Sequence, residues 1–507
     1  MKKLARPVDV ASRGRAAGWN WALDVAGAEP NEPMFLRIAR AISADIRRGR
    51  LGPDMRLPGS RVLARTLDVH RNTVLAAYRE LFAEGWIEAR QGQGTFVARE
   101  LQAVDPQRRH ERSRAKPLQP GRAHAAGFAF EALTEPLPYR VLPNSTLRLW
   151  GGLPDLRLVP NEAFARAQRR VLRAVPNVLG YGNPYGHPKL RAALSSMLRT
   201  TRGLVVEPDD LLITRGSQMA LSLAAQTVLR PGDVVAVEAF GYRPAWHAFS
   251  LTGARIVALP VDEQGLCVSA LTALCEREPV RAIYVTPHHQ YPTTVPLAPA
   301  RRIELLALAA QKRMAVFEDD YDHEFHYEGR PLLPLASADP AAVVIYVGTM
   351  SKVFAPGLRI GYVTAPRAVL QTLAQRRYYL DRQGDQVTEC AMAELIEDGE
   401  LQRHTRRMRR VYELRRNACA HLLEQQLGDA LSFRVPTGGM ALWTRAAPGI
   451  DVEAWAKRAE LQRVSIQSGR QFRHDDKPCP FIRIGYACLG EQEMVEAIRR
   501  LKRALPA

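Results

Sequence analysis

Lys352 is the residue of this 507-residue chain that is most clearly placed to take part in a chemical reaction. It lies in Gly348-Thr-Met-Ser-Lys-Val-Phe-Ala-Pro-Gly-Leu-Arg-Ile-Gly361, just after the apolar run Val343–Val347. A lysine amine held at the end of a strand can form an imine with an aldehyde, which is how an aldehyde cofactor acts on amino compounds. Only nine residues of the chain are lysine, so a lysine inside such a motif is less easily explained by chance.

Chemistry of this kind makes further demands, and the sequence has a candidate for each. A pyridine ring that takes up electrons needs a carboxylate at its nitrogen, and Asp319 follows the strand-like run Met314–Phe317. Tyr321 could donate to the phenolate oxygen of the ring, and Arg359 could bind a phosphate. The remaining candidates are Gly216, Ser217 and Gln218 as an anion cup opening a helix at Met219–Leu229, Tyr242 as the stacking aromatic, and Thr349 and Ser351 as hydroxyl donors.

Each candidate also has an ordinary structural explanation. A single lysine is most often a surface residue, a Gly-Ser pair is most often a turn, Asp319 could cap a helix, and Tyr242 could belong to the core. The candidates nevertheless follow separate strand-like runs in an order that one site could use. Because ligands bind at the carboxyl ends of strands in open α/β sheets, this order favours the chemical interpretation.

The elements that would position these residues form an α/β pattern from about Leu147 onward. Short apolar runs alternate there with helical periods, which predicts a sheet with crossover helices. The expected strands are Leu211–Thr214, Val234–Glu238, Arg255–Leu259, Ala282–Thr286, Met314–Phe317 and Val343–Val347. Helices at His404–Gln426 and Val452–Leu461 and strands near Gly439–Trp443 and Phe481–Tyr486 indicate a smaller α+β lobe. We expect this domain over 147–507, with the small lobe mainly over 400–507.

A second segment, Leu57–Phe96, has the pattern of a domain that reads DNA. The expected elements are helices at Pro33–Arg50, Arg61–Leu67 and Arg71–Ala83, with strands at Trp86–Arg90 and Thr95–Ala98 around a glycine-rich tip. Ser60 is the expected N-cap of the second helix. The inner face of the third helix is expected to be Val74, Ala77, Tyr78, Leu81 and Phe82. Together these elements predict an α+β winged helix-turn-helix over 31–100.

The charge distribution agrees with a polyanion partner for the front of the chain. Residues 1–125 hold 23 Lys and Arg against 13 Asp and Glu, whereas the remaining residues hold 48 against 39. A basic N-terminus can also be no more than a solvated tail, and a small helical domain with a hairpin need not bind DNA. The donor-rich side chains Arg71, Asn72 and Thr73 at the start of the third helix favour DNA, because a recognition helix contacts base edges and phosphates there.

Length and composition bound the remaining possibilities. The chain is too long for one core, so several domains are expected. Residues 1–30 read as a leader, and 101–146 read as a basic, proline-containing linker. No apolar run is long enough to span a bilayer, and no apolar stretch follows the basic residues of Met1–Val10, so we expect no signal peptide. The six cysteines have neither a CxxC pair nor metal-ligand spacing, so we expect a cytoplasmic protein with reduced thiols and no metal site.

The front segment resembles the N-terminal domain of GntR-type bacterial regulators. The resemblance rests on Arg56-Leu-Pro-Gly-Ser-Arg-Val-Leu-Ala-Arg-Thr-Leu-Asp-Val-His-Arg-Asn-Thr-Val-Leu-Ala-Ala-Tyr78 and continues through Glu84-Gly-Trp-Ile-Glu-Ala-Arg-Gln-Gly-Gln-Gly-Thr-Phe-Val97. It implies binding to double-stranded promoter DNA. The residues that fall where this family contacts DNA are Arg61, Arg65, His70, Arg71 and Thr73, with Gly94 and Thr95 at the wing tip.

From Leu147 to the end, the chain resembles a fold-type I, class I aminotransferase that depends on pyridoxal 5'-phosphate (PLP). The matching motifs are Gly151-Gly-Leu-Pro-Asp155, Tyr181-Gly-Asn-Pro-Tyr-Gly-His-Pro-Lys-Leu-Arg191, Ile213-Thr-Arg-Gly-Ser-Gln218, Glu318-Asp-Asp-Tyr321 and Ser351-Lys352 to Arg359. The resemblance implies that Lys352 forms the imine, Asp319 faces the pyridinium nitrogen, Tyr321 the phenolate oxygen and Arg359 the phosphate. Arg483, in Ile482-Arg-Ile-Gly485, matches the arginine that grips a substrate carboxylate.

One loop departs from the aminotransferase pattern. The family often has Asn-Pro-Thr-Gly after the strand expected at Ala282–Thr286, with the asparagine near the phenolate oxygen. Here the loop reads His288-His-Gln-Tyr-Pro-Thr-Thr294, with Tyr291 at the asparagine position. This substitution puts one cofactor contact in doubt, and efficient transamination with it.

The whole arrangement resembles the MocR subfamily of GntR-type transcription regulators. That resemblance implies a head-to-tail homodimer that responds to PLP, or to PLP with an amino compound, through an aldimine at Lys352. Two alternatives stay open: an active PLP-dependent aminotransferase with an accessory DNA-binding domain, and a DNA-binding protein whose second domain is only a dimerisation scaffold. The sequence names neither the effector, nor the operator, nor the sign of regulation.

Overall fold

The computed structural model describes residues 23, 25, 32–103, 141–329 and 332–506. The chain separates into two compact units, Met1–Leu137 and Pro138–Ala507, and each is described by itself. Nearly all of the expected leader (1–30) and most of the expected linker (101–146) lie outside the described residues.

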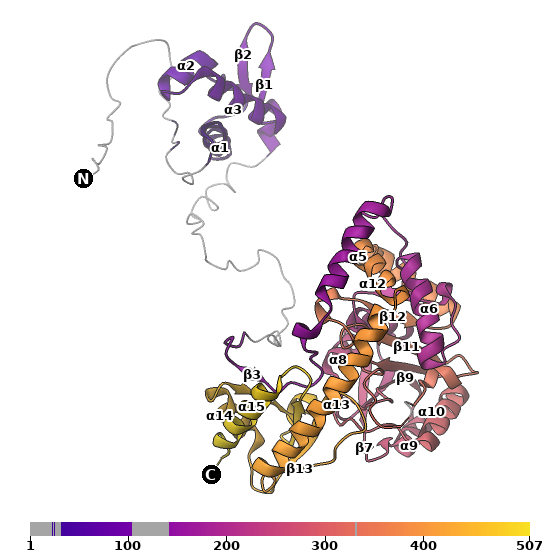
Figure 1. Cartoon of the computed structure of the whole chain (residues 1–507). Helices are drawn as coiled ribbons and strands as arrows, with labels where there is room; N and C mark the ends of the chain where they lie inside the picture. The colour runs from indigo at the N-terminus through magenta and orange to yellow at the C-terminus, as the bar shows by residue number, and fades with distance from the viewer. Residues whose placement is uncertain (1–22, 24, 26–31, 104–140, 330–331, 507) are drawn as a thin grey trace. The chain divides into compact units, whose positions relative to one another are not determined.

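The N-terminal unit contains a winged helix-turn-helix, as expected (Figure 1). Its elements are α1 (Met34–Arg47), α2 (Ser60–Thr66), α3 (Arg71–Ala83), β1 (Ile87–Arg90), β2 (Gly94–Val97) and a 3-10 turn at Arg99–Ala103. The two strands pair antiparallel as the wing, from Ile87 opposite Val97 to Arg90 opposite Gly94. The apolar stripes of α1 and α3 meet in one core that includes Ile38, Ile42 and Leu81.

Two local expectations for this unit were wrong. Ser60 is the first residue of α2, and Gly59 takes the N-cap position without a side-chain hydrogen bond. The Ser60 hydroxyl instead accepts a hydrogen bond from Nε of Arg71 at 3.3 Å, so it links α2 to the start of α3. Phe82 is 36% exposed, because it lies at the edge of the buried stripe of α3. That stripe consists of Val74, Ala77, Tyr78 and Leu81.

The C-terminal unit is built on a seven-stranded sheet in the order β4-β12-β11-β10-β9-β5-β6. Its strands are β4 (Leu212–Thr214), β5 (Val234–Glu238), β6 (Arg255–Leu259), β9 (Val280–Val285), β10 (Ala315–Asp320), β11 (Val344–Thr349) and β12 (Gly361–Thr364). Neighbouring strands run parallel except β12, which is antiparallel to both β11 and β4. The parallel strands therefore present their carboxyl ends at one edge. The short strands β7 (Val261–Asp262) and β8 (Gly265–Leu266) pair with each other in a separate small hairpin.

Both faces of this sheet are buried, which explains its nearly continuous apolar strands. Val344 and Tyr346 of β11 belong to one apolar cluster, and Ile345 and Val347 belong to another on the opposite face. Helices α7 (Ser217–Val228), α8 (Arg243–Ser250) and α11 (Arg367–Leu380) cover the second face. The first is covered by α5 (Asn161–Ala174), α6 (Pro188–Arg202), α9 (Val268–Arg277), α10 (Pro299–Lys312) and α12 (Gln386–Glu397).

Two central strands extend further into polar sequence than expected. β10 was expected to end at Phe317 but continues through Asp320, and β11 was expected to end at Val347 but continues to Thr349. Ladder pairing explains the difference, because Asp319 pairs with Val347 and Asp320 with Gly348. The helix after β4 likewise begins at Ser217, two residues earlier than expected.

A smaller lobe follows in the sequence, drawn in orange and yellow in Figure 1. Its sheet has the order β13-β14-β17-β16, with β13 (Leu431–Phe433), β14 (Ala441–Ala446), β16 (Gln467–Ser468) and β17 (Phe481–Gly485). Its helices are α13 (Glu400–Leu427), α14 (Val452–Leu461) and α15 (Glu491–Arg503). The short strand β3 (Leu147–Arg148) pairs with β15 (Val464–Ser465), so the first described residues of this unit are attached to the small lobe.

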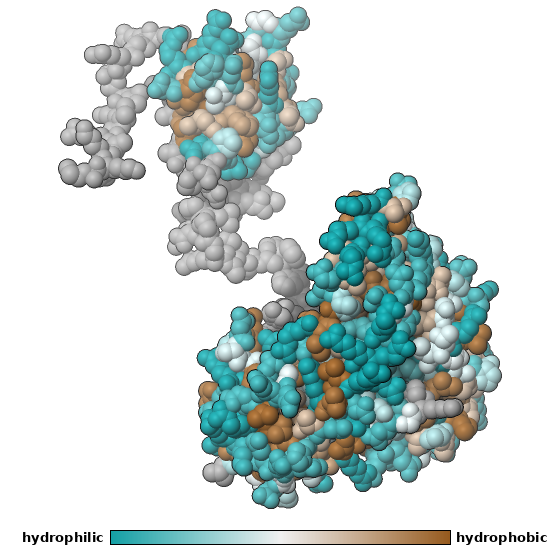
Figure 2. All heavy atoms as spheres, viewed as in Figure 1, coloured by the Kyte–Doolittle hydropathy of each residue, from teal (hydrophilic) through white to brown (hydrophobic). Residues whose placement is uncertain are grey.

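The surface of the C-terminal unit is largely polar in the view of Figure 2, with hydrophobic residues in separate patches. On α13 the arginines Arg403, Arg406, Arg407 and Arg410 are exposed. No helix among the described residues combines the length and the apolar character that crossing a membrane requires.

Candidate cofactor site and DNA interface

The candidate cofactor residues meet at the carboxyl edge of the large sheet. β10 carries Asp319 there, and β11 ends at Thr349, three residues before Lys352. β4 ends at Thr214, just before the turn that leads into α7, and Tyr242 is the N-cap residue of α8 after β5. The parallel direction of these strands, predicted from their alternation with helices, is what brings the separate motifs together.

Lys352 is half-buried and lies close to a buried arginine. Burial, together with the nearby Arg483 guanidinium, lowers the pKa of Lys352 to about 8, although Asp322 and Asp319 act in the opposite direction. Lys352 and Arg483 both approach Gly152. A Cβ at that position would lie 3.4 Å from Lys352 Nζ and 3.9 Å from Arg483 Nη1. A neutral amine is the form that attacks an aldehyde, so this environment prepares Lys352 to bind one.

Asp319 is buried, and one of its two carboxylate oxygens is satisfied by the protein. Oδ2 accepts a hydrogen bond from the Tyr284 hydroxyl at 2.8 Å, whereas Oδ1 is buried without a partner among the described residues. Burial raises the pKa of Asp319 to about 7, and the Tyr284 hydrogen bond opposes that rise. A cationic N–H group placed at Oδ1 would donate a hydrogen bond to this oxygen and would stabilise the ionised, buried carboxylate.

The expected phosphate cup is formed by the turn before α7 and the guanidinium of Arg359. Gly216, with φ of 78°, is the N-cap residue of α7, and Ser217 is its first residue. Arg359 donates from Nη2 to the carbonyl of Arg215 at 2.8 Å and is otherwise exposed. A Cβ at Gly216 would lie only 2.9 Å from the Arg359 guanidinium nitrogens, so glycine is needed for this close approach. Helix amides and a guanidinium together suit a phosphate.

The other expected phosphate and ring donors have protein partners in this structure. The Gln218 amide donates to the Pro244 carbonyl at 2.7 Å, so its contribution to the cup is limited to its backbone. The hydroxyls of Thr349 and Ser351 lie 3.0 Å apart and are buried. The Tyr321 hydroxyl donates to the backbone carbonyl of His289 at 2.9 Å. Contact of Tyr321 with a cofactor oxygen would require this hydrogen bond to be shared or exchanged.

Tyr291, the residue that departs from the aminotransferase pattern, lies between two other tyrosine rings, Tyr242 and Tyr321. Its ring meets those of Tyr242 and Tyr321 edge to face, each with centroids 5.8 Å apart. Cζ of Arg483 lies 4.3 Å from the centroid of the Tyr291 ring, a cation–π contact. An aromatic ring thus occupies the place where the family often has a side-chain amide.

Arg483 is the side chain whose charge most clearly calls for a ligand. It is fully buried on β17, and its three side-chain nitrogens have no hydrogen-bond partner among the described residues. A Cβ at Gly151 would lie 2.7 Å from its guanidinium, so the glycine backbone packs directly against it. A buried guanidinium without an acceptor is costly, and a bidentate carboxylate is the acceptor that fits its geometry.

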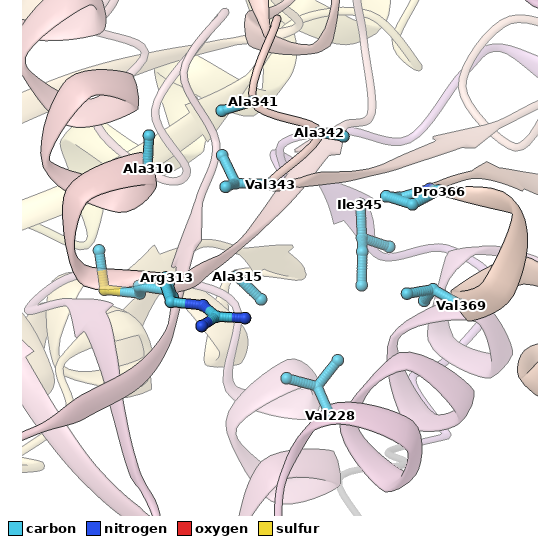
Figure 3. A pocket seen from close by; sticks show the side chains of 11 residues that line it. Val228, Ala310, Arg313, Ala315, Ala341, Ala342, Val343, Ile345, Pro366 and Val369 are labelled. Atoms are coloured by element: carbon cyan, nitrogen blue, oxygen red, sulfur yellow. The ribbon is translucent and has the colours of Figure 1, made fainter.

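These observations fit the group that the sequence implied. Four functional groups lie around the carboxyl edge of the large sheet: the carboxylate of Asp319, the amine of Lys352, the exposed guanidinium of Arg359 and the buried guanidinium of Arg483. PLP, when bound, supplies an aldehyde for an amine and a ring that takes up electrons. A separate cavity, shown in Figure 3, lies at the opposite end of the sheet, where β10 begins at Ala315 and where Val343 and Ile345 flank the first residue of β11. Its lining, which includes Arg313 beside mostly apolar residues, holds none of the candidate residues.

The candidate DNA contacts are exposed on the helix-turn-helix and the wing. Arg61 and Arg65 are exposed on α2, and Arg71 is exposed at the first turn of α3. His70 caps α3 by accepting a hydrogen bond from the Asn72 amide at 3.2 Å. Thr73 on α3 is half-buried, and at the wing Gly94 is exposed and Thr95 half-buried. Together they form a surface of donors suited to phosphates and base edges.

Sequence reasoning missed several residues that belong to these sites. Tyr284 lies on β9 two residues from the expected strand end, and strand alternation could have placed it beside Asp319. Arg56 is exposed and reaches the wing, since a Cβ at Gly94 would lie 3.3 Å from its Nε. The histidines His288 and His289 were read only as part of the departing loop, and no pattern in the sequence showed what they contact.

Comparison with known families agrees with this division of the chain. Residues 35–97 match the family of bacterial regulatory proteins described as gntR, and residues 152–501 match the class I and II aminotransferases. Fold and site together therefore define a winged helix-turn-helix regulator joined to a PLP-dependent aminotransferase domain.

Whole-length relatives carry the same two parts. The chain is 31% identical over 480 residues to the probable rhizopine catabolism regulatory protein MocR of Rhizobium meliloti, and 94% of each chain is covered. It is also 31% identical over 402 residues to the pyridoxine biosynthesis transcriptional regulator PdxR of Corynebacterium glutamicum, covering 79% of this chain and 80% of that one. The chain belongs to the MocR subfamily of GntR-type transcription regulators.

Solved structures support the fold of the second part. LysN, an α-aminoadipate aminotransferase from Thermus thermophilus solved with N-(5'-phosphopyridoxyl)-L-leucine, is similar with a TM-score of 0.67 and 32% identity. The match covers 71% of this chain and 92% of that chain. The expected fold-type I aminotransferase domain and the PLP cofactor are thereby confirmed, while the role of each site residue stays a prediction.

Proposed function

We propose that the protein regulates transcription by detecting PLP, or PLP together with an amino compound, at Lys352 and by changing its binding to promoter DNA accordingly. The observation that carries this proposal is the arrangement of Lys352 and Arg483 on either side of Gly152. An amine-reactive cofactor at the first residue and a carboxylate at the second would make the site selective for a compound with both groups, such as an amino acid.

A change in DNA binding requires that the ligand bind two states of the protein with different affinity. Arg483 lies on β17 of the small lobe, whereas Lys352 follows β11 of the large sheet. A ligand that contacts both residues would therefore favour one relative position of these two parts of the C-terminal unit. The basic linker expected over 101–146 would transmit that preference to the DNA-binding unit.

A homodimer is part of the proposal, and it is supported by exposed aromatic and aliphatic side chains around the segment that matches the Tyr181 motif. Leu179 is 81% exposed, Tyr181 83% and Tyr379 80%. The Arg382 guanidinium holds this group together, with Cζ 4.4 Å from the Tyr181 ring centroid and 5.2 Å from that of Tyr378. Exposed aromatics with an arginine are typical of the centre of a protein interface. Sedimentation equilibrium of the full chain tests the dimer.

An active aminotransferase is the second candidate, favoured by the lowered pKa of Lys352, which is about 8. Tyr291 argues against efficient turnover, because its ring stands where the family often has an amide. Steady conversion of an amino donor to its keto acid over many turnovers would favour the enzyme. A chain that takes up no cofactor would leave only the dimerisation scaffold.

The proposal is tested by replacing Lys352 with alanine in the full chain. Operator binding is measured by fluorescence anisotropy while the PLP-loaded protein is titrated with amino acids and amines. We expect Lys352→Ala to keep its basal operator affinity and to lose the response to cofactor and amine. Lys457→Ala, an exposed lysine on α14, serves as the matched control and should respond like the wild type. A Lys352→Ala protein that responds normally would refute the sensor.

A further inference from the structure

Four histidines gather beside the cofactor site, between the loop after β9 and the segment after β10. His288 and His289 come from the first, and His323 and His326 come from the second. The His288 ring centroid lies 4.4 Å from that of His289, 4.5 Å from that of His323 and 5.8 Å from that of His326. Apart from its contact with Tyr321 through a backbone carbonyl, this cluster has no part in the proposed PLP site.

The cluster is rich in ring nitrogens that have no hydrogen-bond partner. His288 is 6% exposed, and neither of its nitrogens has a partner among the described residues. Nε2 of His289 and Nδ1 of His326 are buried and unpartnered in the same way. Both nitrogens of His323 also lack a hydrogen-bond partner among the described residues, although Nδ1 lies 3.0 Å from Asp320 Oδ2. Buried polar atoms are nearly always paired, so this group of unpartnered ring nitrogens calls for a ligand.

A carboxylate already orients one of these rings. Nδ1 of His289 lies 2.8 Å from Oδ1 of Asp322, and both side chains are buried. That contact occupies Nδ1 of His289, whereas Nε2 is buried without a partner among the described residues. A carboxylate behind a histidine whose other nitrogen is free is the usual support for a metal-binding imidazole.

We propose that His288, His289 and His326 bind one divalent transition-metal ion of the zinc type. One nitrogen from each of these rings lies within 4.8 Å of the others. Because zinc–nitrogen bonds are about 2.0–2.1 Å long, small side-chain rotations bring the three rings onto one ion. His326 is only half-buried, so its side gives the ion access and leaves room for a water molecule as the fourth ligand.

A second grouping, His288 with Asp320 and His323, is less suited to a metal. Oδ2 of Asp320 already accepts a hydrogen bond from the Tyr346 hydroxyl at 2.6 Å. The same oxygen lies 3.4 Å from Arg202 Nε and 3.0 Å from His323 Nδ1. Oδ2 is therefore already engaged within the protein, although Oδ1 is buried without a partner among the described residues. In the first grouping, each imidazole has at least one ring nitrogen without a partner among those residues.

An ion at this position would be joined to the cofactor site through two residues. The backbone carbonyl of His289 accepts the hydrogen bond of the Tyr321 hydroxyl, which is a candidate cofactor contact. Asp322 supports His289 and also acts electrostatically on Lys352. Metal binding would fix the loop that carries His289 and, with it, the hydrogen bond available to Tyr321.

The test uses untagged full-length protein with bound PLP, stripped of metal by dialysis against a chelator. Zn²⁺ binding is measured by isothermal titration calorimetry, and Co²⁺ binding by the visible absorption that imidazole ligands induce. The wild type should bind one ion per chain. His421→Gln, an exposed histidine on α13, is the matched control and should bind equally well.

Two variants separate a metal site from a set of packed histidines. Asp322→Asn should weaken the affinity about 10–100-fold, the effect usual for an outer-shell partner. His326→Gln removes a half-buried ligand and should weaken it at least as much, with unchanged circular dichroism and PLP uptake showing that the fold is intact. If the wild type binds no ion, or if His326→Gln binds Zn²⁺ as tightly as His421→Gln, the proposal is wrong.

Discussion

At the scale of single residues, the site depends on charges that the protein leaves incompletely paired. Among the described residues, the fully buried Arg483 finds no acceptor for its side-chain donors, and Oδ1 of Asp319 finds no donor. Both groups act on Lys352: Arg483 lowers the pKa of its amine, and Asp319 raises it. A cofactor with a cationic ring nitrogen and an amino-acid ligand would give each of these groups a partner. The free energy that burial of the unpaired groups costs would then be recovered on binding and would increase the affinity.

The lowered pKa of Lys352 predicts how fast the cofactor-free protein captures PLP at different pH values. An amine of pKa about 8 is neutral in roughly one molecule of ten at pH 7, compared with roughly one in three thousand for an ordinary lysine of pKa 10.5. Stopped-flow absorbance should show a capture rate that rises with pH and levels off once the pH exceeds about 8. A rate that continues to rise in proportion to hydroxide beyond pH of about 9 would contradict the lowered pKa.

The types of residue at the site were predictable, whereas their partners were not. Asp319, Lys352 and Arg359 stood in motifs with a known order, so their approach followed from the parallel sheet. Tyr284 and the carbonyl of His289 entered the site through contacts across strands and loops. Strand alternation could have placed Tyr284 on the right face of β9, but its contact with Asp319 also depends on the register of two strands. The contact of the His289 carbonyl depends on how a loop packs, which no spacing within one segment contains.

At the scale of elements, the turn between β4 and α7 predicts a sharp requirement for glycine. Gly216→Ala would push a methyl group against the Arg359 guanidinium at 2.9 Å and should weaken PLP affinity about tenfold or more. Gly232→Ala is the matched control, because Gly232 also has a positive φ of 86° but no atom within 4 Å of the added methyl group. Both variants should lose similar thermal stability from backbone strain. Equal PLP affinity in the two would show that the cup is not at Gly216.

The recognition helix α3 predicts an electrostatic effect of Arg71 on DNA binding. Arg71 is exposed at the first turn of α3, where it donates to the Ser60 hydroxyl of α2. Arg71→Ala should weaken operator binding and reduce the slope of log K against log salt by about one, if the side chain contacts one phosphate. Arg79→Ala, an exposed arginine later on the same helix, should leave the slope unchanged. An unaltered slope in Arg71→Ala would exclude the phosphate contact.

Element positions followed closely from hydrophobic periodicity, and so did the ends of some elements but not of others. The bounds of α3, β5, β6 and α14 coincide with the expected ranges, because strong apolar periods define them. β10 and β11 run beyond their apolar residues, since neighbouring strands extend the ladder through Asp319 and Asp320. Ser60 matched the composition of an N-cap, yet its hydroxyl serves the contact between α2 and α3 instead.

At the scale of the whole molecule, one chain joins a GntR-type winged helix-turn-helix to a PLP-dependent aminotransferase domain. The family, the fold class and the PLP cofactor followed from dense motifs, each contained within one unit. The relation between the units could not be predicted in this way, because no motif in the sequence spans both of them. The coupling between them is therefore the part of the account that most needs measurement.

Thermodynamic linkage provides the most direct test of that coupling. The affinity of the PLP-loaded protein for its operator is measured with and without a saturating amino ligand, and the affinity for that ligand is measured with and without operator DNA. The account predicts that both affinities change by the same factor, about 5–150-fold for typical allosteric coupling. If the ligand binds at Lys352 yet neither affinity changes in the presence of the other partner, the protein is not a sensor.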